Sequence, residues 1–329
     1  MNERRLSQAP HPSPNTKPLN DKTPSTKPDP LRQAYPQVTY TTPEDAMAGR
    51  KPLNTSSPQE MTAVLQRLTP RDLTLIDTLG RHRVLTIHQI GLLLFNSEQA
   101  ARARVKVLVD IGVITRFRQA IRPGSQAYRY TLGHLGAYIH AAATHQPTPT
   151  RAATTRRITE LAASQQLNHQ LGINDFYARL THACRVHGGV EVVQWLTERE
   201  ATALAGGTIR PDAAGALRTT TGNEIAFWYE HDRGTETLSH LIQKIRAYDR
   251  LPHHHRQRTL LIEMTSPGRE VNLHKALEHS QTACTVVTAA TPTDPLDAVW
   301  RITRTANTSR SPLIGSLSLP TAGHRSDAS

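Results

Sequence analysis

Three carboxylates in the second half of the chain are placed where they could hold a metal ion. Asp212 follows Pro211, while Glu230 and Asp232 stand two residues apart at the end of an expected strand that starts at Ile225. Alternate residues of a strand share a face, so Glu230 and Asp232 should project to the same side, and a hairpin would bring Asp212 alongside. Three converging carboxylates repel one another unless a hard cation such as Mg²⁺, or an arginine, lies between them.

The segments around these carboxylates predict an α/β domain over residues 161–304. Lys244 lies on a helix expected at about Glu236–Tyr248. His169 lies on a mainly helical stretch, where we interpret it as a core histidine with one satisfied hydrogen bond. A sheet of four or five strands is expected, with strands at Val190–Leu196, Ile225–Glu230, Thr259–Met264 and Cys284–Ala289.

The segment from about residue 68 to 132 predicts a winged helix-turn-helix. A short second helix should follow Thr86, and in this class of fold the first two helices support a third that enters the DNA major groove. The first helix begins at Thr69-Pro70, with proline tolerated at its first position, and its expected apolar stripe is Leu73, Ile76 and Leu79.

The third helix is expected to run from its N-cap, Asn96, to about Ile111. Gln99 stands three residues after Asn96, which is the spacing of a capping box. One face of this helix, formed by Ala101, Val105 and Leu108, should be buried in the core. The polar side chains left for DNA on this helix are Gln99, Arg102, Arg104 and Lys106.

A basic hairpin is expected after the third helix and would form the wing. Its strands are predicted at Ile114–Phe117 and Ala127–Leu132. Residues 61–140 contain eleven Lys and Arg against four Asp and Glu, so part of the chain's positive charge is concentrated here. An amphipathic helical hairpin used for dimerisation is the alternative interpretation of 61–142. The wing residues expected to reach DNA are Arg116, Arg118 and Arg122.

Composition predicts a basic cytoplasmic protein with disordered tails. The formal net charge of the 329 residues is +12, which favours a polyanionic partner, and no apolar run approaches the length of a membrane span. Residues 1–60 contain eleven of the 22 prolines and predict a disordered tail, as does the Ser- and Thr-rich segment 305–329. Residues 143–160 are expected to be a linker. The two cysteines are interpreted as reduced thiols.

Three further segments carry a resemblance to a known family. They are Arg210-Pro211-Asp212, the run Trp228–Thr235, and Lys244–Tyr248. Together they resemble the replication-relaxation family, whose members are linked with plasmid and other mobile-element replication and with DNA relaxation. The resemblance extends over about residues 65–300 and so includes both expected domains.

The same second domain also resembles the restriction-endonuclease-like fold. In that fold Pro-Asp is followed, after a hairpin, by an acidic residue, one spacer and a lysine. The resemblance implies that Asp212 and Glu230 are metal ligands, with Asp232 as a further candidate at the position where the lysine is expected. Lys244, from the following helix, would then supply the missing positive charge.

Three functions follow from these features. The first is a DNA-binding protein of a plasmid or mobile element, acting in replication, DNA relaxation or transfer. The second is a Mg²⁺-dependent endonuclease with Asp212, Glu230 and Lys244 as catalytic residues. The third is a winged-helix transcriptional regulator. A strict relaxase would use Tyr248 with His253–His255, but the few residues across Pro252 give no convincing geometry.

Double-stranded DNA is the expected partner, and replication or transfer proteins are possible further partners. No membrane is expected, and no cofactor beyond Mg²⁺ for a nuclease.

Overall fold

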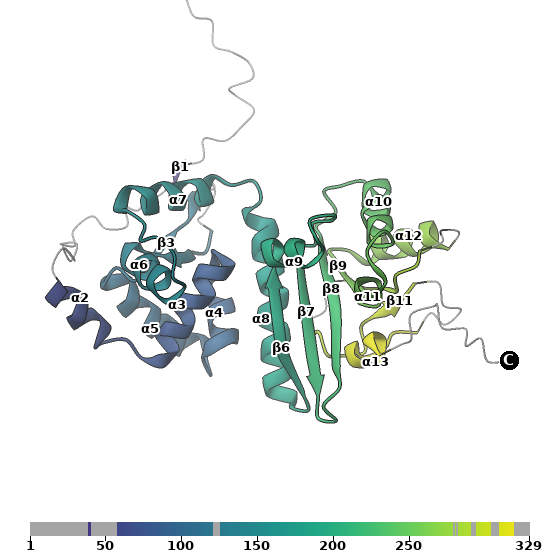
Figure 1. Cartoon of the computed structure of the whole chain (residues 1–329), viewed down its shortest axis with the longest axis horizontal. Helices are drawn as coiled ribbons and strands as arrows, with labels where there is room; N and C mark the ends of the chain where they lie inside the picture. Colours follow the sequence, from purple (N-terminus) through teal and green to yellow (C-terminus); the bar gives the residue numbers. More distant parts are fainter. Residues whose placement is uncertain are drawn as a thin grey trace, which may run out of the picture. The chain divides into compact units, whose positions relative to one another are not determined.

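The computed structural model describes residues 39–40, 58–120, 126–278, 280, 282–290, 294–303 and 309–318 (Figure 1). Arg122 of the expected wing and nearly all of the expected tail 1–60 lie outside these residues. Within the described part of the chain, no helix combines the length and apolar character that a membrane crossing requires. The fold is a mixture of helices and sheets, as the sequence predicted.

The first half of the described chain combines helices with a small antiparallel sheet. The sheet has the strand order β2-β5-β3, and a separate pair is formed by β1 (Thr39–Tyr40) and β4 (Gln119–Ala120). The helices of this half also include α6, which follows β5. The elements are α2 (Pro58–Leu65), α3 (Pro70–His82), β2 (Leu85–Thr86), α4 (Ile87–Leu94), α5 (Glu98–Asp110), β3 (Ile114–Phe117), β5 (Arg129–Leu132) and α6 (His134–Ala143).

Side-chain caps fix where these helices begin. Thr69 and Asp72 form a reciprocal capping box at α3, and Thr86 begins α4 in the same way. The expected N-cap of α5, Asn96, is wrong by one residue. Ser97 holds that position, and its hydroxyl accepts a hydrogen bond of 3.2 Å from the amide of Ala100. This shift removes the capping box that was expected from Gln99.

The buried faces of α3 and α5 form the core of this half. Ala101, Val105 and Leu108 of α5 are buried, as their spacing predicted. The stripe expected on α3 is only partly correct, because Leu73 is half-exposed and Leu75 takes its place beside Ile76 and Leu79. The reason is that the capping box turns Asp72 inward, which rotates the next residue toward solvent.

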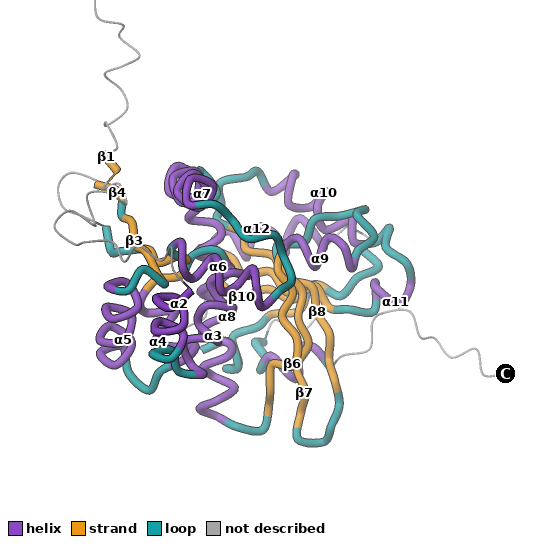
Figure 2. The backbone as a smooth tube through the Cα atoms, turned by 60° about the vertical axis from the view of Figure 1, so that its left-hand side comes forward, coloured by secondary structure: helices purple, strands orange, loops and turns teal. Residues whose placement is uncertain are grey.

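The second half is built on a six-stranded mixed sheet in the order β11-β10-β9-β8-β7-β6, which is larger than the four or five strands expected. Figure 2 shows β6, β7 and β8 of this sheet. Strands β6, β7 and β8 form an antiparallel meander, and β9 and β10 run parallel to β8. The elements are α7 (Arg151–Ala163), α8 (Leu167–His187), β6 (Val190–Thr197), α9 (Glu198–Leu204), β7 (Ala213–Thr219), β8 (Glu224–Asp232), α10 (Leu238–Tyr248), α11 (His253–Arg256), β9 (Thr259–Met264), α12 (Pro267–Leu277), β10 (Val286–Ala290), β11 (Arg301–Ile302) and α13 (Leu313–Leu317).

Helices cover both faces of this sheet. One face packs Trp228 and Ile262 against α9, α10 and α12. The other packs Phe227 and Leu261 against α8 and α13. Helix α8 also packs against α4, so it contacts both halves of the described chain.

Two segments expected to lack structure are partly ordered. The linker predicted over 143–160 is helical from Arg151, because Ile158 of α7 packs into an apolar cluster with Val84 and Phe117. The tail predicted from residue 305 includes α13, whose Leu313 is buried against the sheet. Both predictions rested on composition, which does not reveal that a few apolar residues find a surface to pack on.

Candidate functional site

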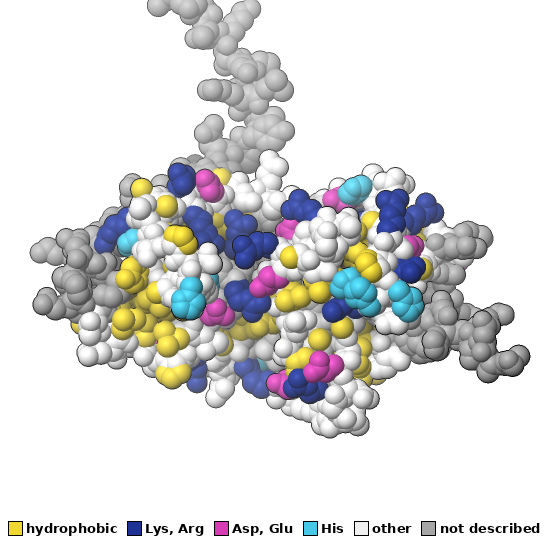
Figure 3. All heavy atoms as spheres, viewed as in Figure 1, with side chains coloured by type: hydrophobic (Ala, Val, Ile, Leu, Met, Phe, Trp, Pro, Cys, Tyr) yellow, Lys and Arg dark blue, Asp and Glu magenta, His cyan; other side chains and the backbone are white. Residues whose placement is uncertain are grey.

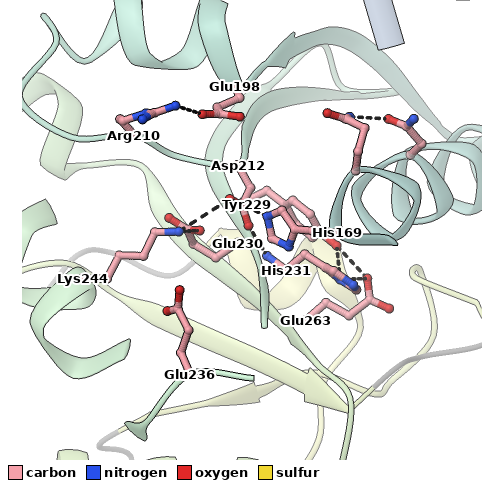
Figure 4. Close-up of polar contacts among 12 residues, drawn as sticks. His169, Glu198, Arg210, Asp212, Tyr229, Glu230, His231, Glu236, Lys244 and Glu263 are labelled. Atoms are coloured by element: carbon pink, nitrogen blue, oxygen red, sulfur yellow. Dashed lines mark hydrogen bonds and ion pairs between the residues drawn. The ribbon is translucent and has the colours of Figure 1, made fainter. Parts of the chain in front are cut away.

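Asp212 and Glu230 lie together at one end of the β7–β8 hairpin (Figure 4). Asp212 immediately precedes β7, and the pairing of Ala213 with Tyr229 sets it beside Glu230. Lys244 reaches them from α10. Its Nζ atom forms an ion pair with Oε2 of Glu230 and lies 3.5 Å from Oδ1 of Asp212. The structure therefore brings together the three residues predicted as catalytic.

Asp212 is held by donors on several sides. Its Oδ1 atom lies 3.1 Å from Nε2 of His169, and its Oδ2 atom accepts a hydrogen bond of 2.7 Å from the backbone amide of His231. Burial alone would raise the pKa of Asp212, but the hydrogen bond from His169 and the charge of Lys244 lower it to about 2. Asp212 is therefore a carboxylate at neutral pH.

Glu230 occupies a more enclosed position, with 2% of its surface exposed. The hydroxyl of Tyr248 donates a hydrogen bond to its Oε1 atom. Burial, followed by repulsion from Asp212, raises the pKa of Glu230 well above its usual value, although Lys244 opposes this. Two neighbouring carboxyl groups whose pKa values are pushed apart are typical of sites that bind cations or move protons.

The polar groups of Tyr248 and Lys244 are both bound within this cluster. Tyr248 is 2% exposed, and its hydroxyl is bound to Glu230, so it is not presented to solvent as a relaxase nucleophile would be. Burial would lower the pKa of Lys244, but Glu230 and Asp212 outweigh it and raise the pKa. Lys244 is therefore a fixed positive charge between two carboxyl groups.

Asp232 does not join this cluster, contrary to the expected set of three carboxylates. Its two oxygens accept hydrogen bonds of 2.5 and 3.0 Å from Arg269 of α12, and Oδ1 also accepts one of 3.0 Å from the amide of Gly234. Glu230 and Asp232 do share a face of β8, but that face meets a different helix at each position. Among the residues with described positions, no group of three or more His, Cys, Asp and Glu side chains is arranged to hold a metal ion.

His169 is a site residue that the sequence analysis placed in the core. It projects from α8 onto Asp212, and its ring centre lies 5.8 Å from that of His231. His231 in turn packs directly on Gly172, one turn further along α8, where a Cβ atom would lie 2.0 Å from the His231 ring. His169 and Gly172 thus fit α8 closely against β8. The available signal was their spacing of three residues on one helix face, but the sequence did not reveal what that face contacts.

A second buried acidic group lies on the opposite face of the sheet. Glu263 of β9 accepts hydrogen bonds of 2.7 Å from both Arg179 and the hydroxyl of Tyr229. Burial raises the pKa of Glu263, while Arg179 and Tyr229 lower it. His231 lies beside this group, with Nδ1 3.9 Å from Oε2 of Glu263. Both acidic groups therefore flank β8 and its histidine.

A cleft of about 890 Å³ opens over the Asp212 cluster. Its walls come from the start of α8, from the end of β8 and from α10, and include His169, Arg233 and Glu236 as well as Asp212 and Glu230. A polar cleft over recessed carboxylates can admit a phosphate-bearing substrate or a hydrated cation.

The residues predicted to contact DNA have different surroundings. Gln99, Arg102 and Lys106 are exposed on α5, where Arg102 forms an ion pair with Glu98. Arg104 instead turns inward, and its guanidinium binds the buried Asp72 at 2.5 and 2.9 Å. Because that contact supports the capping box of α3, Arg104 is engaged within the fold.

The two described arginines of the expected wing lie over one aromatic ring. The guanidinium carbon atoms of Arg116 and Arg118 lie 4.1 and 4.9 Å from the centre of the Tyr128 ring. Such cation–π contacts hold two positive charges at the base of the β3–β5 connection.

The model of the replication-relaxation family matches residues 76–261, which is more than half of the chain. The match runs from within α3 to within β9, so it includes Asp212, Glu230 and Lys244. The chain belongs to the replication-relaxation family. No curated protein and no solved structure matches it.

Proposed function

We propose that the protein is a DNA-binding protein of a plasmid or other mobile element that acts in replication, DNA relaxation or transfer. Family membership supports this role. The element order α3-β2-α4-α5-β3-β4-β5 supports a winged helix-turn-helix in the first half, with α5 as the helix that enters the major groove. The observation that carries the proposal is the exposed polar face of α5 beside the two arginines of the β3–β5 hairpin.

The charges on that face fit a duplex. Arg102 and Lys106 are one turn apart on the exposed side of α5, while its opposite side is buried. Arg116 lies on β3, the strand that follows, and Arg118 comes directly after the end of that strand. In this geometry the helix contacts base edges and phosphates and the hairpin contacts the adjacent backbone, while Arg104 supports the fold from within.

We predict that the double substitution Arg102→Ala/Lys106→Ala weakens binding to duplex DNA and reduces its dependence on salt. Each lost phosphate contact should reduce the slope of log K against log salt by about 0.9. Mobility-shift titrations at several salt concentrations measure both effects. Arg156→Ala/Lys275→Ala removes the same charge from exposed positions on α7 and α12 and serves as the control. Equal affinities and slopes for the two variants would show that α5 is not the recognition helix.

A second candidate function, a Mg²⁺-dependent endonuclease, is favoured by the convergence of Asp212, Glu230 and Lys244. The order α8-β6-α9-β7-β8-α10-α11-β9, with Pro-Asp directly before β7 and a glutamate on β8, supports a restriction-endonuclease-like fold. Mg²⁺ in proteins is commonly bound by one or two carboxylates together with water and substrate phosphate. Asp212 and Glu230 fit that minimal set, whereas the carboxylate of Asp232 is already bound by Arg269.

The residues of the cluster have distinct parts in such a reaction. Asp212 and Glu230 would hold the cation, which when bound would activate water and polarise the phosphate. Lys244 would stabilise the negative charge that develops on the phosphate, since it already lies between the carboxylates. His169 would keep Asp212 oriented and ionised.

The nuclease is tested by incubating the protein with supercoiled plasmid and Mg²⁺ or Mn²⁺. We expect the wild type to nick the plasmid and Asp212→Ala/Glu230→Ala to lose this activity while still binding duplex DNA. The control, Glu198→Ala/Glu236→Ala, removes two exposed carboxylates from the wall of the same cleft and should retain nicking. Intact plasmid with the wild type, beside normal duplex binding, would exclude the endonuclease and leave a protein that binds without cutting, as a regulator does.

A further inference from the structure

A second hollow of about 820 Å³ adjoins the cleft over Asp212. The two share part of their walls, namely Arg83, Gln170, Glu198 and Arg210. The second hollow continues from there between α3, α6, α7 and α9. Because the two hollows share these walls, we treat them as one surface, the arginine groove, which extends from the α3–α7 region to the carboxylate cluster.

Some of the charges in the arginine groove are neutralised within the protein. Arg81 pairs with Glu200 at 3.2 Å, and Arg210 pairs with Glu198 at 2.5 Å. Asp77 lies 3.7 Å from His140. Two of the three acidic side chains that line the second hollow, Glu198 and Glu200, are therefore paired with arginines, and the third, Asp77, lies beside a histidine.

Three arginines of the second hollow have no acidic partner among the ion pairs of the described residues. They are Arg83, Arg157 and Arg199, which lie at the end of α3, on α7 and on α9 and are all exposed. Figure 3 shows Lys and Arg side chains gathered on the face between α7 and α9. Unpaired arginines that line one groove repel one another, and partial burial of the Arg157 guanidinium, together with the charge of Arg83, lowers the pKa of Arg157. An anion between them would relieve that repulsion.

Arg83 is held in place by its backbone. It ends α3 with a φ of 70°, and its carbonyl accepts a hydrogen bond of 2.6 Å from the hydroxyl of Thr131. Asn174 of α8 binds the carbonyl groups on either side of it. A non-glycine residue in the left-handed region is uncommon, and here the surroundings fix it so that an arginine enters the groove.

We propose that the arginine groove binds the phosphodiester backbone of an unpaired DNA strand and leads it to Asp212, Glu230 and Lys244. This inference rests on the proposed role in DNA metabolism and adds a binding surface separate from α5. The carboxylates are recessed, with Asp212 only 8% and Glu230 only 2% exposed, so a phosphate must enter the cleft to reach them. A single strand is flexible enough to do so, and a positively charged groove that follows the backbone is the usual way to bind one.

The test compares a groove variant with a control of equal charge. The groove variant is Arg83→Gln/Arg157→Gln/Arg199→Gln. The control, Arg156→Gln/Arg218→Gln/Lys275→Gln, changes three exposed cations outside both hollows. Fluorescence anisotropy at several salt concentrations measures binding to a short labelled single strand of mixed sequence and to a blunt duplex.

We expect the groove variant to bind the single strand roughly tenfold or more weakly than the wild type. Three lost contacts at about 0.7 each should reduce its salt slope by about 2. The control should bind the single strand like the wild type, and both variants should retain duplex binding through α5. Unchanged single-strand binding in the groove variant, or an equal loss in the control, would overturn the proposal.

The outcomes also separate this inference from the proposed function. A wild type that binds duplex but no single strand overturns the arginine groove and leaves the role of α5 intact. A wild type that binds no duplex, but binds a single strand in a manner that only the groove variant disrupts, supports the groove and contradicts the winged-helix proposal.

Discussion

Replacing Asn174 with alanine is expected to lower the free energy of unfolding by about 3 to 4 kcal/mol. Asn174 lies on α8 and is completely buried. Its Nδ2 atom donates to the carbonyl oxygens of His82 and Val84 at 3.2 and 2.6 Å. Its Oδ1 atom lies 3.1 Å from Nδ1 of His82 and accepts a hydrogen bond of 3.0 Å from Gln170. One side chain therefore satisfies polar groups on α3, on the turn after it and on α8.

The size of the effect follows from what alanine would leave behind. Each buried polar group that loses its partner costs about 1 to 3 kcal/mol, and here two carbonyl groups and the His82 ring lose theirs together. Partial relaxation and water entry keep the total below the sum of these costs. The contact also joins α8, which carries His169, to the end of α3, which carries Arg83, so we expect the loss to loosen both functional surfaces.

Asn168→Ala is the matched control, since Asn168 lies on the same helix but is exposed. It should change stability by less than about 0.5 kcal/mol. Urea unfolding followed by circular dichroism measures both variants. Equal midpoints for the two would show that the Asn174 contacts do not stabilise the fold.

The local elements that position the candidate site could be predicted because their causes are local. Thr69 and Thr86 begin helices through side chains three residues away, and the alternation along β8 places Glu230 on one face. The hairpin between β7 and β8 then brings Asp212 beside it. The resemblance of the same segment to the restriction-endonuclease-like fold led to the same pair of carboxylates.

The partners of individual charges could not be predicted, because they come from elements distant in sequence. Asp232 shares the face of Glu230, as predicted, but Arg269 comes from α12, which the sequence analysis did not predict. Arg104 was assigned to the DNA side of its helix, yet the charge of the buried Asp72 draws it inward. In both cases the residue type and the helix or strand face were known, and the unknown was the long-range packing that decides which opposite charge is within reach.

His169 and Asn174 illustrate the same limit on one helix. The unusual polarity of this part of α8 was visible in the sequence, but a polar residue in a buried helix fits a core hydrogen bond as well as a site. Packing distinguishes them, since His169 meets Asp212 and Asn174 meets the end of α3. Their different roles follow from which side of α8 faces the sheet and which faces α3.

Acidification from pH 7 to pH 4.5 is expected to remove about 2.5 kcal/mol of unfolding free energy through His82 alone. Burial lowers the pKa of His82 from 6.5 to about 4, although its contact with Asn174 opposes this. Asn174 donates to two carbonyl groups through Nδ2, so its Oδ1 atom faces His82, whose Nδ1 must carry the proton of the neutral ring. A second proton would place a positive charge in a site where His82 is almost completely buried, and burial disfavours that charge.

The sign and the pH range of this effect follow from the two pKa values of His82. Above pH 6.5 the histidine is neutral in both the folded and the unfolded state. Between pH 6.5 and about 4 only the unfolded chain binds the proton, so stability decreases as the pH is lowered across that range. Burial raises the pKa of Glu230 and Glu263, so these groups change stability in the opposite direction on acidification, and the total stability does not isolate His82.

The measurement therefore compares the loss of stability in two proteins. Urea unfolding of the wild type and of His82→Gln at pH 7 and pH 4.5 should show the wild type losing about 2.5 kcal/mol more than the variant, whatever the variant's stability at pH 7. Identical losses in the two proteins would mean that His82 is not held neutral by the fold.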